Sequence, residues 1–334
     1  MNQIAVKSTL SRRSFIAATL AAPFATPPRS AQANTVDWPN RPVRLVTLAA
    51  AGAGTDAIAR VLSEALARRW GQPVIVDNRP GGDGIVSVET FLAARDGNHT
   101  LLFNPTGVWT ALHLMHDKLS FDTRRDLVPL AFVAQDFLAL AASPRLGLAS
   151  LGEIVTAAQA KPGTMTWACA PSVPFLAFTA FLKSSGLDLT YVPYRNPMAS
   201  LPDLAEGRVD LAFLPLQPLV GPAAAGKLKL LAVASDDRAP LAPDVPTARE
   251  AGYPALALTG GHCLFGPREM PEALCARIAS DVRSTLAEAT VAKRLTEMGY
   301  VPRPQSTEDF TLFLEKEYAR WTEVAQANGV RPVQ

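Results

Sequence analysis

The chain has 334 residues, of which 32 are Lys or Arg and 30 are Asp or Glu, so its formal net charge is +2. The first 33 residues contain four basic residues and no acid, which leaves 28 basic against 30 acidic residues and a net charge of −2. A near-neutral chain without a basic stripe argues against nucleic-acid binding, because clustered cations are needed to contact the phosphates.

The N-terminal residues contain the three parts of an export signal. Ser11–Ile16 reads as a twin-arginine pattern, an apolar run to Ala25 follows, and Ala31-Gln32-Ala33 offers small residues for cleavage. The apolar run is too short to anchor the chain in a bilayer. A disordered basic N-terminus is the alternative. We predict that residues 1–33 are a twin-arginine signal peptide and that the mature protein begins at Asn34 in the periplasm.

Residues 41–84 alternate between strand and helix patterns. Arg41–Leu48 is a short β-rich run, a glycine turn follows at Ala51–Asp56, and an apolar face then recurs at helical spacing. Gln72–Asp77 is a second strand pattern, and a second glycine turn closes it at Asn78–Gly84. This order predicts a βαβ unit, in which the loop after each strand faces a ligand crevice and helix amides favour an anion.

The same alternation continues along the chain and predicts an α/β fold, and about 300 mature residues predict two domains. Strands are predicted at Thr100–Phe103, Leu130–Ala134, Leu138–Ala142, Met165–Cys169, Thr190–Val192, Asp210–Leu214, Leu228–Ala234 and Leu256–Thr259. Helices are predicted at Ser150–Ala160, Pro174–Ser184, Ala199–Glu206, Pro271–Ala287, Val291–Met298 and Thr307–Ala327. The last of these has one apolar stripe at three- and four-residue spacing, typical of a buried face: Phe310, Phe313, Leu314, Tyr318, Trp321 and Val324.

An ordered set of short motifs resembles a known family. Pro42–Val46, Gly52–Asp56 and Gly71–Gly82 correspond to its opening strand, glycine turn, and second strand with its turn. Further matches run to the C-terminus: Asp96–Leu102, Lys161–Gly163, Val192–Tyr194, Gly207–Asp210, Ala225–Leu228, Leu241–Thr247 and Glu250–Gly252. The chain is similar to the periplasmic substrate-binding proteins of tripartite tricarboxylate transporters, the Bug family.

This resemblance implies a two-lobed periplasmic binding protein fold, in which each lobe is a mixed sheet flanked by helices and two crossing strands join the lobes. Residues 34–137 and 260–334 would form lobe 1, and residues 138–259 would form lobe 2. The implied protein is a monomer without a cofactor that captures a small organic acid between the lobes and delivers it to membrane transporter subunits. A sensor subunit for a membrane histidine kinase and an exported α/β enzyme are the alternatives.

Carried over by position, the resemblance also implies ligand-binding residues in both lobes: Ala51, Gly52, Gly54, Thr55, Asp56, Thr106, Gly107 and Trp109 in lobe 1, and Cys169, Ala170, Ser172, Arg195, Asn196 and Leu214 in lobe 2. Thr55 and Asp56 lie where a helix N-cap is expected, so we assign Asp56 a capping or water-holding role. Taken alone, Thr106-Gly107 also fits an ordinary turn, Arg195 a solvent-facing charge, and Trp109 a core residue.

The chain departs from the family where ligand contacts are expected. Val173-Pro174-Phe175 and Leu214 replace polar or acidic family residues, so the cleft has lost hydrogen-bonding groups. An apolar site cannot compensate the desolvation of a second or third carboxylate. We therefore predict a monocarboxylate with an apolar or aromatic body rather than a citrate-like acid or an acidic amino acid.

The sequence contains no assembled catalytic set and no metal motif. His113 and His116 have helical spacing but no acidic third ligand, and we expect a solvated helix surface there. Gly52-Ala53-Gly54 with Asp77 loosely fits a dinucleotide-binding fingerprint, but export argues against a dehydrogenase.

The three cysteines, Cys169, Cys263 and Cys275, match no zinc motif and cannot all pair. We expect at least one of them to be a buried single thiol. By analogy with the family, Cys169 and Cys263 both lie near the cleft, and a bridge between them is the alternative.

Overall fold

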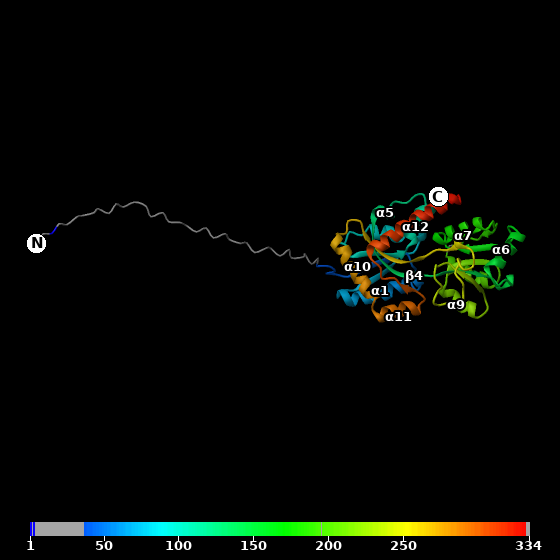
Figure 1. The fold of residues 1–334 in the computed structure, drawn as a ribbon, viewed down its shortest axis with the longest axis horizontal. Helices are drawn as coiled ribbons and strands as arrows, with labels where there is room; N and C mark the ends of the chain where they lie inside the picture. Colours follow the sequence, from blue (N-terminus) through cyan, green and yellow to red (C-terminus); the bar gives the residue numbers. More distant parts are fainter. Residues whose placement is uncertain (2, 4–36, 195, 332–334) are drawn as a thin grey trace. The chain divides into compact units, whose positions relative to one another are not determined.

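The computed structural model describes residues 1, 3, 37–194 and 196–331. The body of the predicted signal peptide and Arg195 lie outside these residues. The chain divides into two compact units, Met1–Asp37 and Trp38–Gln334. The second unit contains all the helices and strands named below (Figure 1).

Two mixed β-sheets form the framework of the second unit (Figure 1). The six-stranded sheet has the order β11-β4-β10-β3-β1-β2 and consists of β1 (Val43–Thr47), β2 (Val74–Asn78), β3 (Thr100–Pro105), β4 (Leu127–Asp136), β10 (Gly260–Pro267) and β11 (Val301–Pro302). The five-stranded sheet has the order β7-β6-β8-β5-β9 and consists of β5 (Leu138–Ala142), β6 (Thr166–Cys169), β7 (Thr190–Tyr191), β8 (Leu211–Pro215) and β9 (Lys229–Val233).

The pairing directions decide where the loops meet. β1 pairs in parallel with β2 and β3, and β6 pairs in parallel with β7 and β8. β10 and β5 are antiparallel to both of their neighbours. The loops that follow β1 and β3 therefore lie at one edge of the first sheet, and those that follow β6 and β8 lie at one edge of the second.

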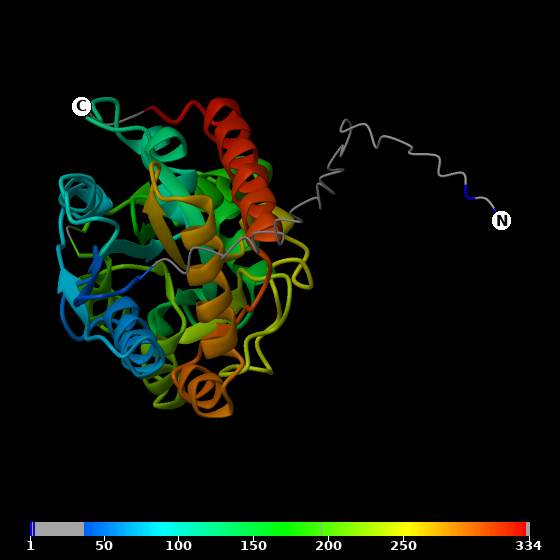
Figure 2. The ribbon, with the colours of Figure 1, turned by 90° about the vertical axis from the view of Figure 1, so that its left-hand side faces the viewer.

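The helices pack against these sheets, as in Figure 2, where α10 and α12 lie in front of the strands. The longer ones are α1 (Gly54–Trp70), α2 (Ile85–Leu92), α6 (Leu151–Ala160), α7 (Val173–Ser184), α8 (Ser200–Ala205), α9 (Gln217–Ala224), α10 (Glu272–Leu286), α11 (Ala289–Glu297) and α12 (Thr307–Ala327). One-turn helices are α3 (Gly107–Thr110), α4 (Leu112–Met115) and α5 (Thr123–Asp126), and 3₁₀ turns are η1 (Gly82–Gly84), η2 (Pro144–Leu146), η3 (Pro197–Ala199) and η4 (Pro254–Leu256).

The chain changes sheet twice. β4 ends in the first sheet at Asp136, and β5 begins in the second sheet at Leu138. The chain returns between β9 and β10, which begins at Gly260. These two passages occur where the crossings were predicted, while the lobe boundaries themselves stay a prediction.

The last helix packs into both cores. Phe310 and Leu314 of α12 belong to a cluster with β3, β4 and β10, whereas Trp321 and Ala325 belong to the cluster around β5, β6 and α7. The apolar stripe predicted for this helix is therefore confirmed as a buried face. Its C-terminal half packs on the core of predicted lobe 2, although the sequence prediction assigned the whole helix to lobe 1.

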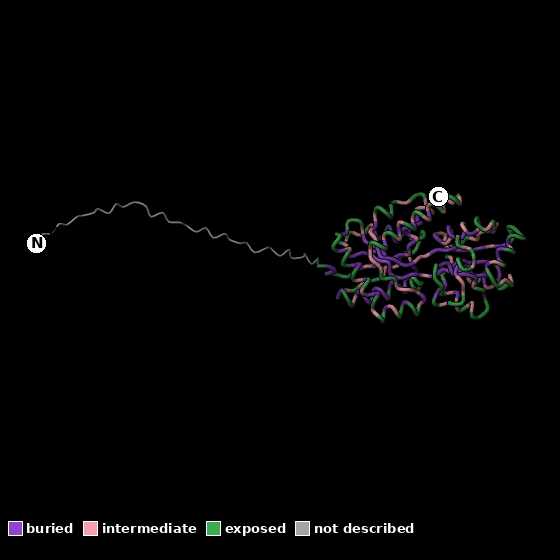
Figure 3. Tube along the Cα trace, in the orientation of Figure 1, coloured by how far each residue is buried: buried purple, intermediate pink, exposed green. Residues whose placement is uncertain are grey.

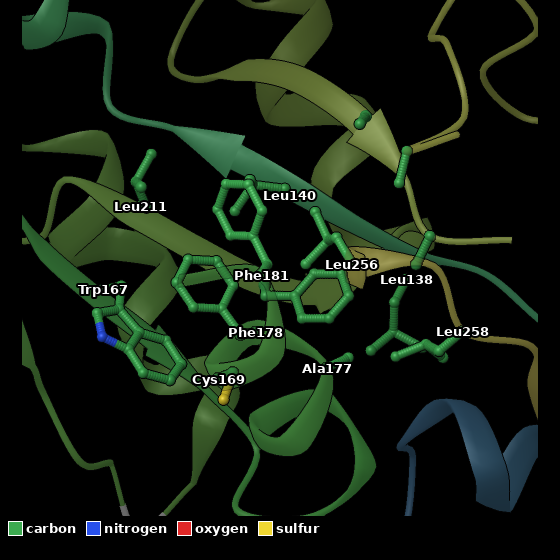
Figure 4. Close-up of a cluster of buried hydrophobic side chains, with 14 of the residues drawn as sticks. Leu138, Leu140, Trp167, Cys169, Ala177, Phe178, Phe181, Leu211, Leu256 and Leu258 are labelled. Atoms are coloured by element: carbon green, nitrogen blue, oxygen red, sulfur yellow. The ribbon is translucent and has the colours of Figure 1, made fainter. Parts of the chain in front are cut away.

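The second sheet contains one strand that is buried on both faces, and buried segments run through the interior in Figure 3. All five residues of β5 are buried, as expected for a central strand covered on both sides. Aromatic packing fills the space between this sheet and α7 (Figure 4). Trp167 stacks on Phe178 with ring centroids 4.2 Å apart, and Phe178 meets Phe181 edge-on at 5.5 Å.

Most predicted strands and helices are confirmed to within a few residues, but the strand at Leu256–Thr259 is wrong. η4 occupies Pro254–Leu256, and the strand begins only at Gly260. The sequence prediction also missed α9, because Pro218 in its first turn and Pro222 inside it read as loop residues.

All three cysteines are free thiols, which confirms the expectation of unpaired buried thiols and excludes the alternative of a Cys169–Cys263 bridge. Cys169 and Cys263 are buried in different hydrophobic clusters, one beside α7 and one beside α12 and β3. Burial raises the pKa of both thiols.

Candidate ligand-binding site

A cavity of about 300 Å³ is lined by residues from both sheets. Its walls come from the loops after β1, β3, β6 and β8, from the two places where the chain changes sheet, and from α12. The cavity therefore lies at the carboxyl ends of parallel strands in both sheets, where α/β proteins place their ligands.

Most of the cavity wall is apolar. Leu214 and Trp321 line the cavity, although they are only 0% and 1% exposed. The other large apolar residues of the wall are Leu48, Val108, Leu138, Val173, Phe213 and Leu258. A ligand body placed here gains roughly 25 cal/mol for each Å² of apolar surface that it buries.

Two helices begin at this cavity, one from each side. α3 starts at Gly107 after Thr106, and α7 starts at Val173 after Ser172. Amides in the first turn of a helix that lack a protein acceptor carry partial positive charge, which favours an anion. Trp109 N–H donates to Thr106 and Phe175 N–H donates to Ser172, and Pro174 has no N–H, so the amides left for an anion are those of Gly107, Val108 and Val173. The two starts almost touch, because a Cβ added to Gly107 would lie 2.8 Å from Ser172 Oγ, and the Ser172 side chain would have to move to accept it.

The ionisable side chains that line the cavity in the described part of the chain are all acidic: Asp83, Asp136 and Glu317. Burial raises the pKa of Asp136 to about 6. A hydrogen bond from its own backbone N–H lowers this pKa, but the effect is smaller than that of burial. Its Oδ1 atom is buried without a hydrogen-bond partner. Burial also raises the pKa of Glu317, against the opposing effect of Arg320, whose Nη1 is 3.6 Å from Glu317 Oε2. When ionised, the described charged groups of the cavity wall therefore favour a cation over an anion.

The structure brings five of the predicted ligand-binding residues to the cavity wall: Thr106, Gly107, Ala170, Ser172 and Leu214. They come from β3 and α3 in the first sheet region and from β6, α7 and β8 in the second. The remaining predicted residues that the structure describes do not line the cavity.

The glycine turn at Ala51–Asp56 is one of these. Asp56 is buried, and its carboxylate accepts hydrogen bonds from the Gly52 N–H at 2.8 Å and from Asn78 Nδ2 at 2.9 Å. It also accepts one from Arg60 Nε at 2.9 Å. Burial raises the pKa of Asp56, but these hydrogen bonds outweigh it and hold the pKa below its usual value. Asp56 closes the turn, and the prediction that it caps the helix is wrong, because the N-cap is Ala53 without a side-chain bond.

The start of α1 is covered by residues from distant parts of the chain. Thr55 Oγ1 lies 2.9 Å from His262 Nε2, and burial lowers the pKa of His262 to about 3. A Cβ on Gly54 would lie less than 3.0 Å from the Tyr300 hydroxyl. Gly54 therefore allows Tyr300 to pack closely against the start of α1. This contact explains the glycine without a ligand.

Three other predicted residues have local structural roles away from the cavity. Trp109 is 2% exposed and meets Tyr318 edge-on at 5.9 Å. Cys169 is buried, with its Sγ 3.2 Å from the carbonyl oxygen of Ala170. Asn196 is exposed and accepts a hydrogen bond from the Met198 N–H at 3.1 Å. Arg195 is outside the described residues.

A family model described as the tripartite tricarboxylate transporter family receptor matches residues 58–330. The chain belongs to this family. BugT of Bordetella pertussis is 27% identical over 298 residues, which cover 88% of this receptor and 91% of BugT. A solved R. palustris protein with adipate has a TM-score of 0.81 at 28% identity, covering 89% of this receptor and 100% of that chain. MatC from Rhodopseudomonas palustris with bound malate has a TM-score of 0.75 at 29% identity, with 86% and 99% covered.

The family and the fold agree. This receptor has the periplasmic binding protein fold, and it belongs to a periplasmic family of solute receptors rather than of enzymes. No helix of the described chain is long and apolar enough to cross a membrane. Within that same part, no group of three or more His, Cys, Asp or Glu side chains could hold a metal ion.

One histidine prediction needs correction. His113 stacks on Tyr318 with ring centroids 4.3 Å apart, and burial lowers its pKa. The expected solvated surface is therefore wrong for His113. His116 instead lies 3.1 Å from the carboxylate of Asp83 through its Nε2 atom.

Sequence reasoning missed many residues of the receptor's cavity, among them Asp136, Glu317 and Trp321. Glu317 and Trp321 are four residues apart on α12 and thus share a face, but the apolar stripe suggested only core packing. Asp136 ends a strand whose preceding residues are buried, and a polar residue at that position marks where a strand leaves the core. That signal was available in the sequence, whereas the presence of Asp136 and Glu317 in one cavity wall was not.

Proposed function

We propose that this receptor binds a small organic acid in the cavity and delivers it to the membrane subunits of a tripartite transporter. The observation that carries the proposal is the meeting of two helix starts, at Gly107 and Val173, in a cavity with otherwise apolar walls. Their amides suit one carboxylate group. The solved relatives named with adipate and malate support an organic acid as the ligand.

We further propose a monocarboxylate with an apolar or aromatic body. No Lys, Arg or His among the described residues lines the cavity, so a second carboxylate would find no cationic partner among those residues. It would also lie near Asp136 and Glu317, and burying an unpaired ion costs several kcal/mol. The apolar wall formed by Leu214, Phe213 and Trp321 instead suits a hydrocarbon or aromatic group.

For the route to the periplasm, we propose that residues 1–33 are a twin-arginine leader and that the mature receptor is a monomer beginning at Asn34. The sequence pattern around Arg12 and Arg13 supports this proposal.

Isothermal titration calorimetry with citrate, glutamate, benzoate and 4-methylpentanoate tests the ligand class. We expect binding of at least one of the two apolar acids and none of citrate or glutamate. Gly107→Ala should weaken that binding at least tenfold, because the added methyl displaces Ser172. Gly221→Ala is the matched control, since no atom lies within 4 Å of its added Cβ. Tight citrate binding with silent apolar acids would contradict the proposal.

A further inference from the structure

We infer that Asp136, Thr106 and Gly260 form a second polar subsite in this cavity, which binds an ammonium group, so that the receptor takes an α-amino acid with an apolar side chain. This inference rests on the proposed binding of a carboxylate and specifies the ligand further.

The first support is geometric. Asp136 ends β4, Thr106 follows β3, and Gly260 begins β10, and all three line the cavity. A Cβ added to Gly260 would lie 3.1 Å from Asp136 Oδ1 and 3.7 Å from Thr106 Oγ1. Gly260 thus lets its backbone approach a carboxylate oxygen and a hydroxyl together, two acceptors for an N–H donor on the same side of the glycine.

The second support is the unbalanced charge of the wall. Asp83 has a partner in His116, and Glu317 has Arg320 at 3.6 Å. Asp136 has no histidine or arginine partner of this kind, and its buried Oδ1 lacks any hydrogen-bond partner. A buried carboxylate without a partner is strongly unfavourable, and an ammonium group on the ligand would offset that cost. With a pKa of about 6, Asp136 is mainly ionised at neutral pH and able to attract a cation.

The third support is the position of this subsite relative to the helix starts. Thr106 directly precedes Gly107, whose helix start is proposed to hold the carboxylate. The acceptors for the ammonium therefore lie beside the donors for the carboxylate. An α-amino acid carries both groups on one carbon atom, and its side chain would then face the apolar wall at Leu214 and Trp321.

Calorimetry with two matched sets of compounds tests this inference. The branched set is L-leucine, 4-methylpentanoate and 3-methylbutylamine, and the aromatic set is L-phenylalanine, 3-phenylpropanoate and 2-phenylethylamine. In at least one set, we expect the amino acid to bind at least tenfold more tightly than the plain acid. Asp136→Asn should reduce the affinity for the amino acid to that for the acid, and Asp117→Asn, which removes an exposed carboxylate that does not line the cavity, should not.

The outcomes separate this inference from the proposed function. If both plain acids bind as tightly as their amino acids, or if Asp136→Asn leaves the preference unchanged, the ammonium subsite is refuted while carboxylate binding stands. If an amine binds as tightly as its amino acid, the carboxylate proposal fails and the ammonium subsite stands. No binding by any member of either set refutes both. Gly260→Ala, which adds a methyl group on the side of the two acceptors, should also remove the preference for the amino acid.

Discussion

Replacing Gly54 by alanine measures how closely Tyr300 packs on the start of α1. The backbone of Gly54 does not require glycine, since its φ is not among the positive values of the chain. Alanine alone would therefore stabilise the fold by about 0.4–1 kcal/mol through the unfolded state. Its Cβ, however, would lie less than 3.0 Å from the Tyr300 hydroxyl, and such overpacking costs about 1–3 kcal/mol. We expect a net loss of about 1–2 kcal/mol in the free energy of unfolding.

A double-mutant cycle with Tyr300→Phe, followed by urea denaturation, isolates this contact. Without the hydroxyl, the nearest remaining ring atom is Cζ at 3.6 Å, which is an ordinary contact. Gly54→Ala should then be neutral or stabilising, with a coupling energy of about 1–3 kcal/mol. Gly221→Ala, with open space around its Cβ, should be insensitive to Tyr300→Phe. An equal loss from Gly54→Ala in both backgrounds would refute the contact and return Gly54 to the list of candidate ligand contacts.

Three further predictions concern the cavity and export. Burial raises the pKa of Asp136 from 3.8 to about 6, so its contribution to stability is present below pH 3.8 and is lost as the pH rises through 6. The difference in unfolding free energy between wild type and Asp136→Asn should therefore change by about 2 kcal/mol between pH 4 and pH 7, and a constant difference in urea titrations would contradict this. Leu214→Asp should abolish calorimetric binding of apolar ligands, because it places another carboxylate in the apolar wall, and unchanged affinity would show that Leu214 does not contact the ligand. Replacing Arg12 and Arg13 by lysine should leave unprocessed protein in the cytoplasm on immunoblots of cell fractions, and normal processing would exclude twin-arginine export.

The sequence by itself determined the secondary structure and its order, because these depend on neighbours in the chain. The apolar stripe from Phe310 to Trp321 follows the helical period, and the run Leu138–Ala142 is apolar throughout, as a doubly covered strand must be. The ordered family motifs also led to the correct family. Where local signals conflicted, as with the prolines of α9, the prediction failed for the same local reason.

Which loops form the cavity was decided only by the tertiary structure. The sequence suggested that Gly52 and Gly54 bind a ligand. In the structure, the Gly52 N–H donates a hydrogen bond to Asp56, and the Tyr300 hydroxyl lies next to Gly54. Thr106 alone fitted an ordinary turn, yet the parallel strands bring it to the cavity.

The acidic residues of the cavity also could not be grouped from the sequence alone. Asp136 and Glu317 are far apart in the sequence, and neither residue carries a local pattern that points to the other. Their presence in one cavity wall depends on how α12 crosses from one core to the other, with Phe310 in the first and Trp321 in the second. Periodicity records only which face of an element is buried, whereas the chemistry of a cavity depends on which buried faces are brought together by packing.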